Sequence, residues 1–381
     1  MRKNVLFAFL FLIVIHNFSF GQTYESDKFH KFIYKDKIGF IDEGLKVMIP
    51  TVFDKAENFE NGLAIVTVNN KIQVIDDKEK ILVSDDNVVG INKLCSNLFL
   101  LTYNDRTHKI FNSDNKQMYQ IDGDDFYASP KKSNNVNFID SKDNQFFTAI
   151  KYDKKKDCTI LSIYSNNMKL IHEFCNVNCH APVSGGYIAL HDEKDHNNQS
   201  SLYSIDGNLL IKGIIEGTLY FSEGLIGISI IKDSQHKELF INAKGNTVFE
   251  IPENTFNHND MKVPPQVTSY FSEGVIYIPN ALGKAKIFDN KGNCLFINNK
   301  YERIEQSSNG LLLACEKYRP FNDHSAYGYI DKEGKEKIPF IFDEAESFYN
   351  GYACVVLKGQ NGILDTKGNF INSSDIVNKD K

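Results

Sequence analysis

The sequence predicts an all-β protein made of tandem β-hairpin repeats, each roughly 35–45 residues long. Three observations lead to this fold class. One long motif occurs near both ends of the chain, and turn signals recur at regular intervals between the two copies. The segments beside these turns are short and rich in β-branched and aromatic residues, as strands are.

The long motif keeps the same order and spacing in both copies. Residues 39–64 contain Gly-Phe-Ile-Asp, Ile-Pro, Phe-Asp and Phe-Glu-Asn-Gly-Leu-Ala. Residues 328–353 contain Gly-Tyr-Ile-Asp, Ile-Pro, Phe-Asp and Phe-Tyr-Asn-Gly-Tyr-Ala. The interval from position 41 to 59 and the interval from 330 to 348 are both 18 positions. We therefore interpret both segments as copies of one structural unit.

Partial copies of the motif lie between these two. Phe-Ser-Glu-Gly occurs at residues 221–224 and 271–274, each time before an apolar run. We interpret the phenylalanine as a packing anchor, the glycine as a special backbone position and the glutamate as a solvated turn residue. The predicted repeat anchors are Phe59, Gly62, Phe221, Gly224, Phe271, Gly274, Phe348 and Gly351.

Turn signals of the form Asp/Asn-x-x-Gly, or a close variant, mark the units. They start at positions 42, 76 and 112, at 206 and 242, and at 289, 331 and 365, so the steps are 34, 36, 36, 42 and 34 positions. An acidic or amide residue that opens a four-residue turn, with glycine at its end, suits a type I turn closed by a residue at positive φ. Each unit is therefore predicted to be a hairpin followed by a further strand.

Two arrangements of such units are possible. We favour a closed β-propeller, because the chain begins with a strand-like segment at residues 31–34 and ends on an incomplete unit after Asp365, so the two ends can complete one blade. Closure then places residues 31–34 beside the strands around Ile363 or Phe370. The alternative is an open β-solenoid or hairpin stack, in which each unit touches only its neighbours and the two ends lie far apart.

The motif resembles the WG-repeat family of bacterial proteins. The similarity is close at residues 38–68 and 327–357 and partial at 202–231 and 361–371. The chain contains no tryptophan, and Ile38, Tyr327 and Asn361 stand where the family has its tryptophan. The resemblance implies a β-rich repeat array and no shared catalytic residues.

The N-terminus has the features of a signal peptide. Arg2 and Lys3 precede a fully apolar run at residues 5–15, which is too short to span a bilayer, since a span needs about 20 residues. Ser19 and Gly21 are the small residues that a signal peptidase reads. We therefore predict a signal peptide at residues 1–21, a WG-type repeat domain at 22–371 and a polar C-terminal tail at 372–381. The mature protein is expected in the periplasm or outside the cell, without a transmembrane span.

Composition excludes several classes of protein. The net charge is −6 and becomes −8 once Arg2 and Lys3 are removed, so the chain lacks the basic surface of a nucleic-acid-binding protein. Hydrophobic residues make up 42% of the chain, which is enough for a folded core. The seven cysteines follow no regular framework, and several lie within apolar runs, so we expect few disulfides.

A group of soft ligands is the strongest local candidate for a metal site. His172, Cys175, Cys179 and His180 carry the thiols and imidazoles that zinc prefers, although their spacing matches no established zinc pattern. A Cys175–Cys179 disulfide is a second interpretation. It requires a turn at residues 176–178, because four extended steps of about 3.3 Å exceed the ~7 Å limit for a bridge.

No motif indicates catalysis or a cofactor. The Phe-Ser-Glu-Gly segments have no histidine in matching positions, and neither a nucleophile elbow nor a nucleotide-binding loop occurs. The sequence therefore predicts a non-enzymatic exported scaffold that contacts an unknown protein or surface glycan. The alternatives are an envelope hydrolase that uses loop carboxylates and a purely structural envelope protein.

Export can be checked directly on the protein recovered from the cell envelope. Signal peptidase is expected to cut after Gly21, so the mature chain should begin at Gln22. Intact-mass measurement or N-terminal sequencing identifies the new end, including a cyclised glutamine. Envelope-located protein that still begins at Met1 would contradict the prediction.

Overall fold

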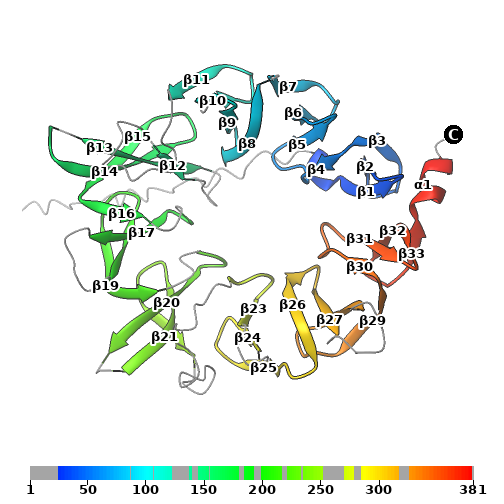
Figure 1. Ribbon diagram of the computed structural model, residues 1–381. Coiled ribbons are helices and arrows are strands. Elements are labelled where there is room, and N and C mark those ends of the chain that lie inside the picture. Colours follow the sequence, from blue (N-terminus) through cyan, green and yellow to red (C-terminus); the bar gives the residue numbers. More distant parts are fainter. Residues whose placement is uncertain are drawn as a thin grey trace, which may run out of the picture.

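The computed structural model describes residues 25–85, 87–105, 107–121, 137–139, 145–153, 155–179, 184–192, 199–216, 221–232, 235–251, 270–278, 285–316 and 326–379. The predicted signal peptide lies outside these residues. Within them the protein is a β-propeller, because small antiparallel sheets follow one another around a closed ring (Figure 1). The predicted all-β class and the predicted closed array are confirmed.

Four sheets form the first half of the ring after a short 3-10 helix, η1 (Glu25–Lys28). Each is a meander in which consecutive strands pair. The first sheet is β1 (His30–Tyr34), β2 (Lys37–Ile41) and β3 (Val47–Phe53); the second is β4 (Lys55–Ala56), β5 (Leu63–Val68), β6 (Lys71–Asp76) and β7 (Ile81–Ser84); the third is β8 (Val88–Cys95), β9 (Leu98–Tyr103), β10 (His108–Asn112) and β11 (Gln117–Ile121); the fourth is β12 (Asn137–Ile139), β13 (Phe146–Asp153), β14 (Cys158–Ser165) and β15 (Leu170–Cys175).

Four more sheets complete the ring. The fifth has seven strands and holds two consecutive units, which are joined where β19 pairs with β20. It contains β16 (Val177–Cys179), β17 (Tyr187–Asp192), β18 (Ser200–Ser204), β19 (Leu209–Glu216), β20 (Leu225–Lys232), β21 (Gln235–Asn242) and β22 (Thr247–Glu250). The sixth is β23 (Val275–Ile278), β24 (Lys286–Asp289) and β25 (Cys294–Ile297); the seventh is β26 (Tyr301–Ser308), β27 (Leu311–Glu316), β28 (Tyr327–Ile330) and β29 (Glu336–Phe342); the eighth is β30 (Glu344–Ala345), β31 (Tyr352–Leu357), β32 (Gln360–Asp365) and β33 (Phe370–Asn372).

The sequence repeat does not coincide with one sheet. In the first copy the Gly-Phe-Ile-Asp and Ile-Pro parts lie on β2 and β3 of the first sheet, whereas Phe59 and the following strand β5 belong to the second sheet. The second copy is divided in the same way between the seventh and eighth sheets. Each repeat therefore links two neighbouring sheets through its own backbone.

The predicted hairpin turns are present. Asp331 opens the turn between β28 and β29, and its Oδ1 accepts hydrogen bonds from the backbone N–H groups of Glu333 and Lys335 at 3.2 and 2.8 Å. Gly334 closes this turn with a φ of 78°, where a side chain is disfavoured. In the first repeat, Leu45 rather than Gly44 takes the corresponding conformation, with a φ of 64°. The glycine there is one position early, so a non-glycine residue closes the turn.

The aromatic positions of the repeat pack between sheets. Phe59 is 0% exposed and lies 4.8 Å from the Phe40 ring, centroid to centroid. Its cluster joins residues of the first and second sheets. Phe348 is 3% exposed, 4.7 Å from the Tyr329 ring, and it joins the seventh and eighth sheets in the same way.

The ring closes by packing between the first and last sheets. Figure 1 shows β1 and β2 beside β31, β32 and the C-terminal helix α1 (Ser373–Lys379). One buried cluster contains Phe32 and Ile41 of the first sheet together with Ile363 and Ile376. The predicted proximity of residues 31–34 to Ile363 is therefore confirmed, and the open stack is excluded.

Two details of the ends differ from the sequence-based expectation. The ends do not complete one shared blade: β1 pairs with β2, and β30–β33 form a separate sheet. The segment expected to be a polar tail forms α1, because Ile376 completes the buried cluster and is 2% exposed.

Replacing Phe59 or Phe348 with alanine should lower the free energy of unfolding by about 3–5 kcal/mol, because each change removes an aromatic ring from a core shared by two sheets. Equilibrium denaturation measures the loss. Ile341→Ala is the matched control, since Ile341 is 53% exposed and should cost little. A loss below about 1 kcal/mol at both phenylalanines would refute their role as anchors.

Candidate functional site

The four Phe-x-x-Gly segments and two similar segments without phenylalanine form a set of tight turns that we name the turn ladder. In each turn two consecutive central residues have positive φ, which defines a type I′ hairpin turn. The predicted glycines Gly62, Gly224, Gly274 and Gly351 take the second central position, with φ between 77° and 93°. The turns of the ladder are residues 60–62, 184–186, 222–224, 272–274, 308–310 and 349–351.

The first residue of each of several turns bonds the next turn. Ser272 Oγ donates a hydrogen bond to the Ser307 carbonyl oxygen at 2.7 Å, and this carbonyl directly precedes the turn at 308–310. Ser184, Ser222 and Ser308 make the equivalent hydrogen bonds to the carbonyl oxygens of Phe221, Phe271 and Phe348. From the fifth sheet to the eighth, successive units are therefore joined by one serine hydroxyl group each.

Tyr349 makes the corresponding contact at the junction of the first and last sheets, where its hydroxyl takes the place of the serine hydroxyl. Its hydroxyl lies 3.1 Å from the Asp27 carbonyl oxygen and 3.0 Å from the Phe59 carbonyl oxygen. Asn350 Nδ2 also donates to the Asp27 carbonyl at 2.7 Å. A tyrosine reaches further than a serine, so it connects to the N-terminal segment where the ring closes.

The second residue of a turn accepts a hydrogen bond from the backbone N–H group of the glycine in the following turn. The Glu223 carboxylate accepts the Gly274 N–H at 2.9 Å, and Asn309 Oδ1 accepts the Gly351 N–H at 3.0 Å. Asp27 accepts the Gly62 N–H at 2.7 Å in the same manner. The ladder therefore has both donors and acceptors between successive turns.

Glu273 is the most connected member of the ladder. Its carboxylate accepts the backbone N–H groups of Asn309 and Gly310 at 2.6 and 2.8 Å, and the Ser307 hydroxyl at 2.7 Å. Glu223 and Glu273 are exposed turn residues, as predicted, and they also accept backbone N–H groups of the neighbouring turns. These bonds explain why glutamate occupies φ values of 50° and 53°, which are unfavourable for a side chain of this kind.

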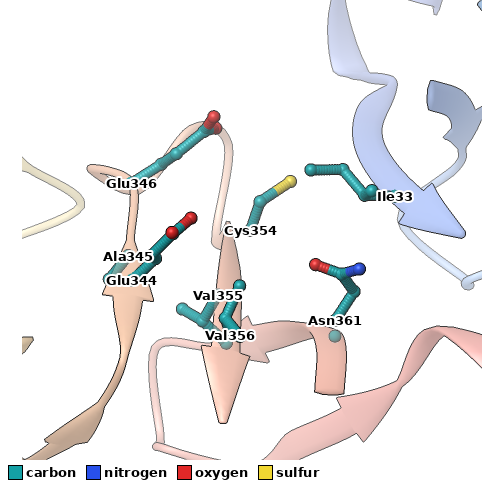
Figure 2. Close-up of a pocket in the computed structure, with 9 residues that line it drawn as sticks. Ile33, Glu344, Ala345, Glu346, Cys354, Val355, Val356 and Asn361 are labelled. Carbon is teal, nitrogen blue, oxygen red and sulfur yellow. The ribbon is translucent and has the colours of Figure 1, made fainter. Parts of the chain in front are cut away.

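Two small cavities lie at the junction of the first and last sheets, which we name the seam. The larger has a volume of about 110 Å³ and is lined by Ile33, Glu346, Cys354 and Asn361, among others. In Figure 2 the Cys354 sulfur points toward Ile33, and the Glu346 carboxylate lies at the opposite side of the opening. The smaller has a volume of about 40 Å³ and shares Glu346 and Cys354 with the first.

The Cys354 thiol at the seam has low reactivity at neutral pH. Cys354 Sγ donates a hydrogen bond to the Lys31 carbonyl oxygen at 3.1 Å. Burial, with the nearby Glu346 charge, raises the pKa of Cys354 to about 12. A protonated thiol is a poor nucleophile, so at neutral pH Cys354 joins the sheets rather than attacking a substrate.

His30 is buried beside the seam. It is 3% exposed, its Nδ1 lies 3.1 Å from the Tyr349 carbonyl oxygen, and its ring packs edge-on against Tyr352 at 4.7 Å. Burial lowers the pKa of His30 below its ordinary value, despite the opposing effects of the Tyr349 carbonyl, Glu43 and Asp42. The imidazole is therefore held neutral.

The proposed metal ligands do not form a site in the described part of the chain. His172 packs edge-on against Phe174 at 4.6 Å on β15, and Cys175 is an exposed free thiol. Cys179 ends β16 in the next sheet, and His180 lies outside the described residues. Among the described residues, no three His, Cys, Asp or Glu side chains are grouped to hold a metal ion.

The suggested Cys175–Cys179 disulfide is absent. Asn176 has a φ of 57° and supplies the predicted turn. That turn carries the chain into the fifth sheet, where Cys179 pairs with Leu190, while Cys175 remains a free thiol on the fourth sheet.

The four predicted phenylalanine anchors differ in burial. Phe59, Phe271 and Phe348 are buried, whereas Phe221 is half-buried and stacks on Tyr187 at 5.0 Å. The hydrogen bonds between the turns of the ladder were not predicted from the sequence. The available signal was the hydroxyl-bearing residue that follows Phe in three of the four anchor segments, with tyrosine in the last.

Comparison with protein families identifies the repeat. Residues 38–71 and 327–360 match the family described as WG containing repeat. The chain contains WG repeats. The two matched WG repeats run from β2 to the start of β6 and from β28 to the start of β32, which confirms the resemblance seen in the sequence. Comparison with curated proteins gives no match.

Several solved structures are similar in fold. BamB from Moraxella catarrhalis has 10% identity and a TM-score of 0.40, covering 77% of this chain and 95% of that chain. Dipeptidyl peptidase 4 of Porphyromonas gingivalis has 12% identity and a TM-score of 0.50, covering 88% and 64%. The WD40 domain of SCAP from fission yeast has 7% identity and a TM-score of 0.35, covering 89% and 92%. At these identities the likeness concerns the fold alone.

In the part of the chain that the structure describes, no helix is long and apolar enough to cross a bilayer.

Glu273→Ala should destabilise the protein by about 1–3 kcal/mol more than Glu223→Ala. The Glu273 carboxylate accepts three hydrogen bonds and the Glu223 carboxylate accepts one. Each of these bonds is made to a charged group, so the two additional bonds of Glu273 account for the difference. The two positions have nearly the same φ, so the backbone contribution of alanine cancels in the comparison. Urea denaturation measures both losses. Equal losses of unfolding free energy in the two variants would show that the additional hydrogen bonds of Glu273 do not stabilise the protein.

Stability should fall as the pH drops below 6.5, the ordinary pKa of histidine, because the unfolded chain then binds a proton that folded His30 does not. The contribution of neutral His30 to the free energy of unfolding is fully present above pH 6.5. It is lost as the pH falls through the lowered pKa that His30 has in the folded state. His30→Gln should reduce the slope of unfolding free energy against pH. His108, whose pKa burial also lowers, should retain its part of the slope in this variant. An unchanged slope in His30→Gln would exclude the effect.

Proposed function

We propose that this WG-repeat protein is an exported, non-catalytic scaffold that binds another protein along the outer rim of its propeller. A propeller fits an interaction scaffold, and the observation that supports the rim is a series of exposed apolar side chains on successive outer strands. Export is inferred from the basic start, apolar run and small-residue exit of the N-terminus.

The rim is formed by the last strand of each sheet. Large apolar side chains with 38–53% exposure lie on seven of these strands in the described ranges. Ile297 and Ile341 are the most exposed, at 53% each. The rim residues are Met48 and Val52 on β3, Ile81 on β7, Tyr119 on β11, Leu170 on β15, Val248 on β22, Ile297 on β25 and Ile341 on β29.

An outer strand with apolar side chains suits an extended protein segment. The last strand of a sheet presents backbone N–H and C=O groups on its free side, which another strand can pair with. Side chains at alternate positions then select the partner by their shape and polarity. Because seven of the eight sheets offer such a strand in the described ranges, the propeller presents several related surfaces around its circumference.

The ladder carboxylates favour a scaffold over a hydrolase. A hydrolase would need acidic side chains that are free to act on a substrate. Glu223 and Glu273 instead accept backbone N–H groups of neighbouring turns. Their role is to hold the ring on which the rim is displayed.

Site-specific photocrosslinking in the producing cell tests the rim. A photoreactive residue at Ile297 or Ile341 should give one adduct of defined mass that contains a peptide of the partner. Lys332 is the matched control, because its side chain is 57% exposed but lies in the β28–β29 turn rather than on the rim. Ile341→Asp should weaken crosslinking from Ile297 only if one partner spans both sheets.

The alternatives give different adducts. Equal crosslinking at the rim and at Lys332 would refute a rim-directed partner. Adducts that lose their added mass on deglycosylation would assign the surface to a glycan instead of a protein. An unprocessed Met1 terminus would remove the export part of the proposal and leave the rim test unaffected.

A further inference from the structure

Two cysteines lie at one end of the fourth sheet. Cys158 is the first residue of β14 and Cys175 is the last residue of β15. In the register of these strands Cys175 lies opposite Ile160. Cys158 and Ile160 share a face because side chains alternate along a strand. The two cysteines are therefore diagonal neighbours on one face of the sheet.

The side chains of the two cysteines interact. The Cys158 and Cys175 thiols form a hydrogen bond, and both are free thiols. Their environments differ, since Cys158 is 5% exposed and Cys175 is exposed. Burial, followed by the neighbouring Cys175 thiol, raises the pKa of Cys158. An external reagent therefore meets Cys175 first.

The backbone at Cys175 permits the short movement that a bond needs. Diagonal partners in an antiparallel sheet are about 7–8 Å apart between Cα atoms, and a disulfide needs about 7 Å or less. Asn176 adopts a φ of 57° directly after Cys175 and ends β15. A strand end can shift by about 1 Å more easily than a strand centre, because it has fewer ladder hydrogen bonds to distort.

We propose that Cys158 and Cys175 are the two halves of a reversible disulfide that fastens the outermost strand of the fourth sheet. The oxidant is a small-molecule or protein disulfide. The Cys175 thiolate attacks it, forming a mixed disulfide and releasing one thiolate. Cys158 loses its proton and attacks the Cys175 sulfur, which forms the Cys158–Cys175 bond and releases the second thiolate. The protein loses two electrons and two protons, and the oxidant becomes two thiols.

The bridge would act between two parts of the ring. Cys175 directly precedes the residues that carry the chain from β15 to β16, and so from the fourth sheet to the fifth. Phe174 and Val177 on either side of it pack against a buried cluster that both sheets share. A bond at this point ties the passage between the sheets to β14 and restricts the unfolded chain by closing the segment 158–175.

Glutathione disulfide is the probe for the test. The purified, folded, reduced mature protein is incubated with it, alkylated and digested. The expected result is that Cys158 and Cys175 are no longer alkylated and that digestion yields a peptide linked through them. In Cys158→Ser, glutathione should remain attached to Cys175, because the resolving thiol is missing. The oxidised protein should unfold at a higher urea concentration than the same protein reduced.

Controls separate this pair from the other cysteines. Cys294→Ser is the matched control for Cys175→Ser, since both remove an exposed thiol from an outer strand, and only Cys175→Ser should abolish the linked peptide. A Cys175–Cys179 peptide would overturn the proposal. Stable glutathione on Cys175 of the wild-type protein would overturn it as well, because Cys158 would then have failed to resolve the mixed disulfide.

Discussion

Hydrogen bonds between successive turns of the ladder hold the ring together from the fifth sheet, across the seam, to the second sheet. Each sheet is small, and strand pairing within it gives no connection to most of its neighbours. From the fifth sheet round to the second, the ladder supplies that connection by pairing hydroxyls with carbonyls and carboxylates or amides with glycine N–H groups. Glutamate at positive φ is tolerated because its carboxylate fixes the next turn. Local backbone strain is thus offset by contacts between repeats.

Hydrophobic packing acts at the same junctions. The WG repeat begins in one sheet and ends in the next, so its aromatic residues fill the space between the two. Phe59 and Phe348 contact residues from both sides of their junctions. A repeat that straddles two sheets links them covalently as well as by packing. Most of the sheets have only three or four strands, and this arrangement explains how such small sheets form one closed array.

The seam is the junction where the regular pattern changes. Tyr349 takes the place of serine and reaches two carbonyls of the N-terminal half, while Cys354, His30 and α1 add contacts between the ends. Covalent continuity is missing between the first and last sheets, so side-chain contacts alone must close the ring. The neutral His30 and the protonated Cys354 are suited to this buried position because neither carries a charge there.

The all-β class, the repeat unit, the hairpin turns and the aromatic anchor positions could be predicted from the sequence, because each depends on local spacing and on residues with marked backbone preferences. The sequence did not reveal that Glu273 and Tyr349 bond residues 36 and 290 positions away, because such contacts are set by the curvature of the whole ring. The same holds for Cys158 and Cys175, whose approach depends on strand register, and for Ile376, which is buried only because the ends of the chain meet.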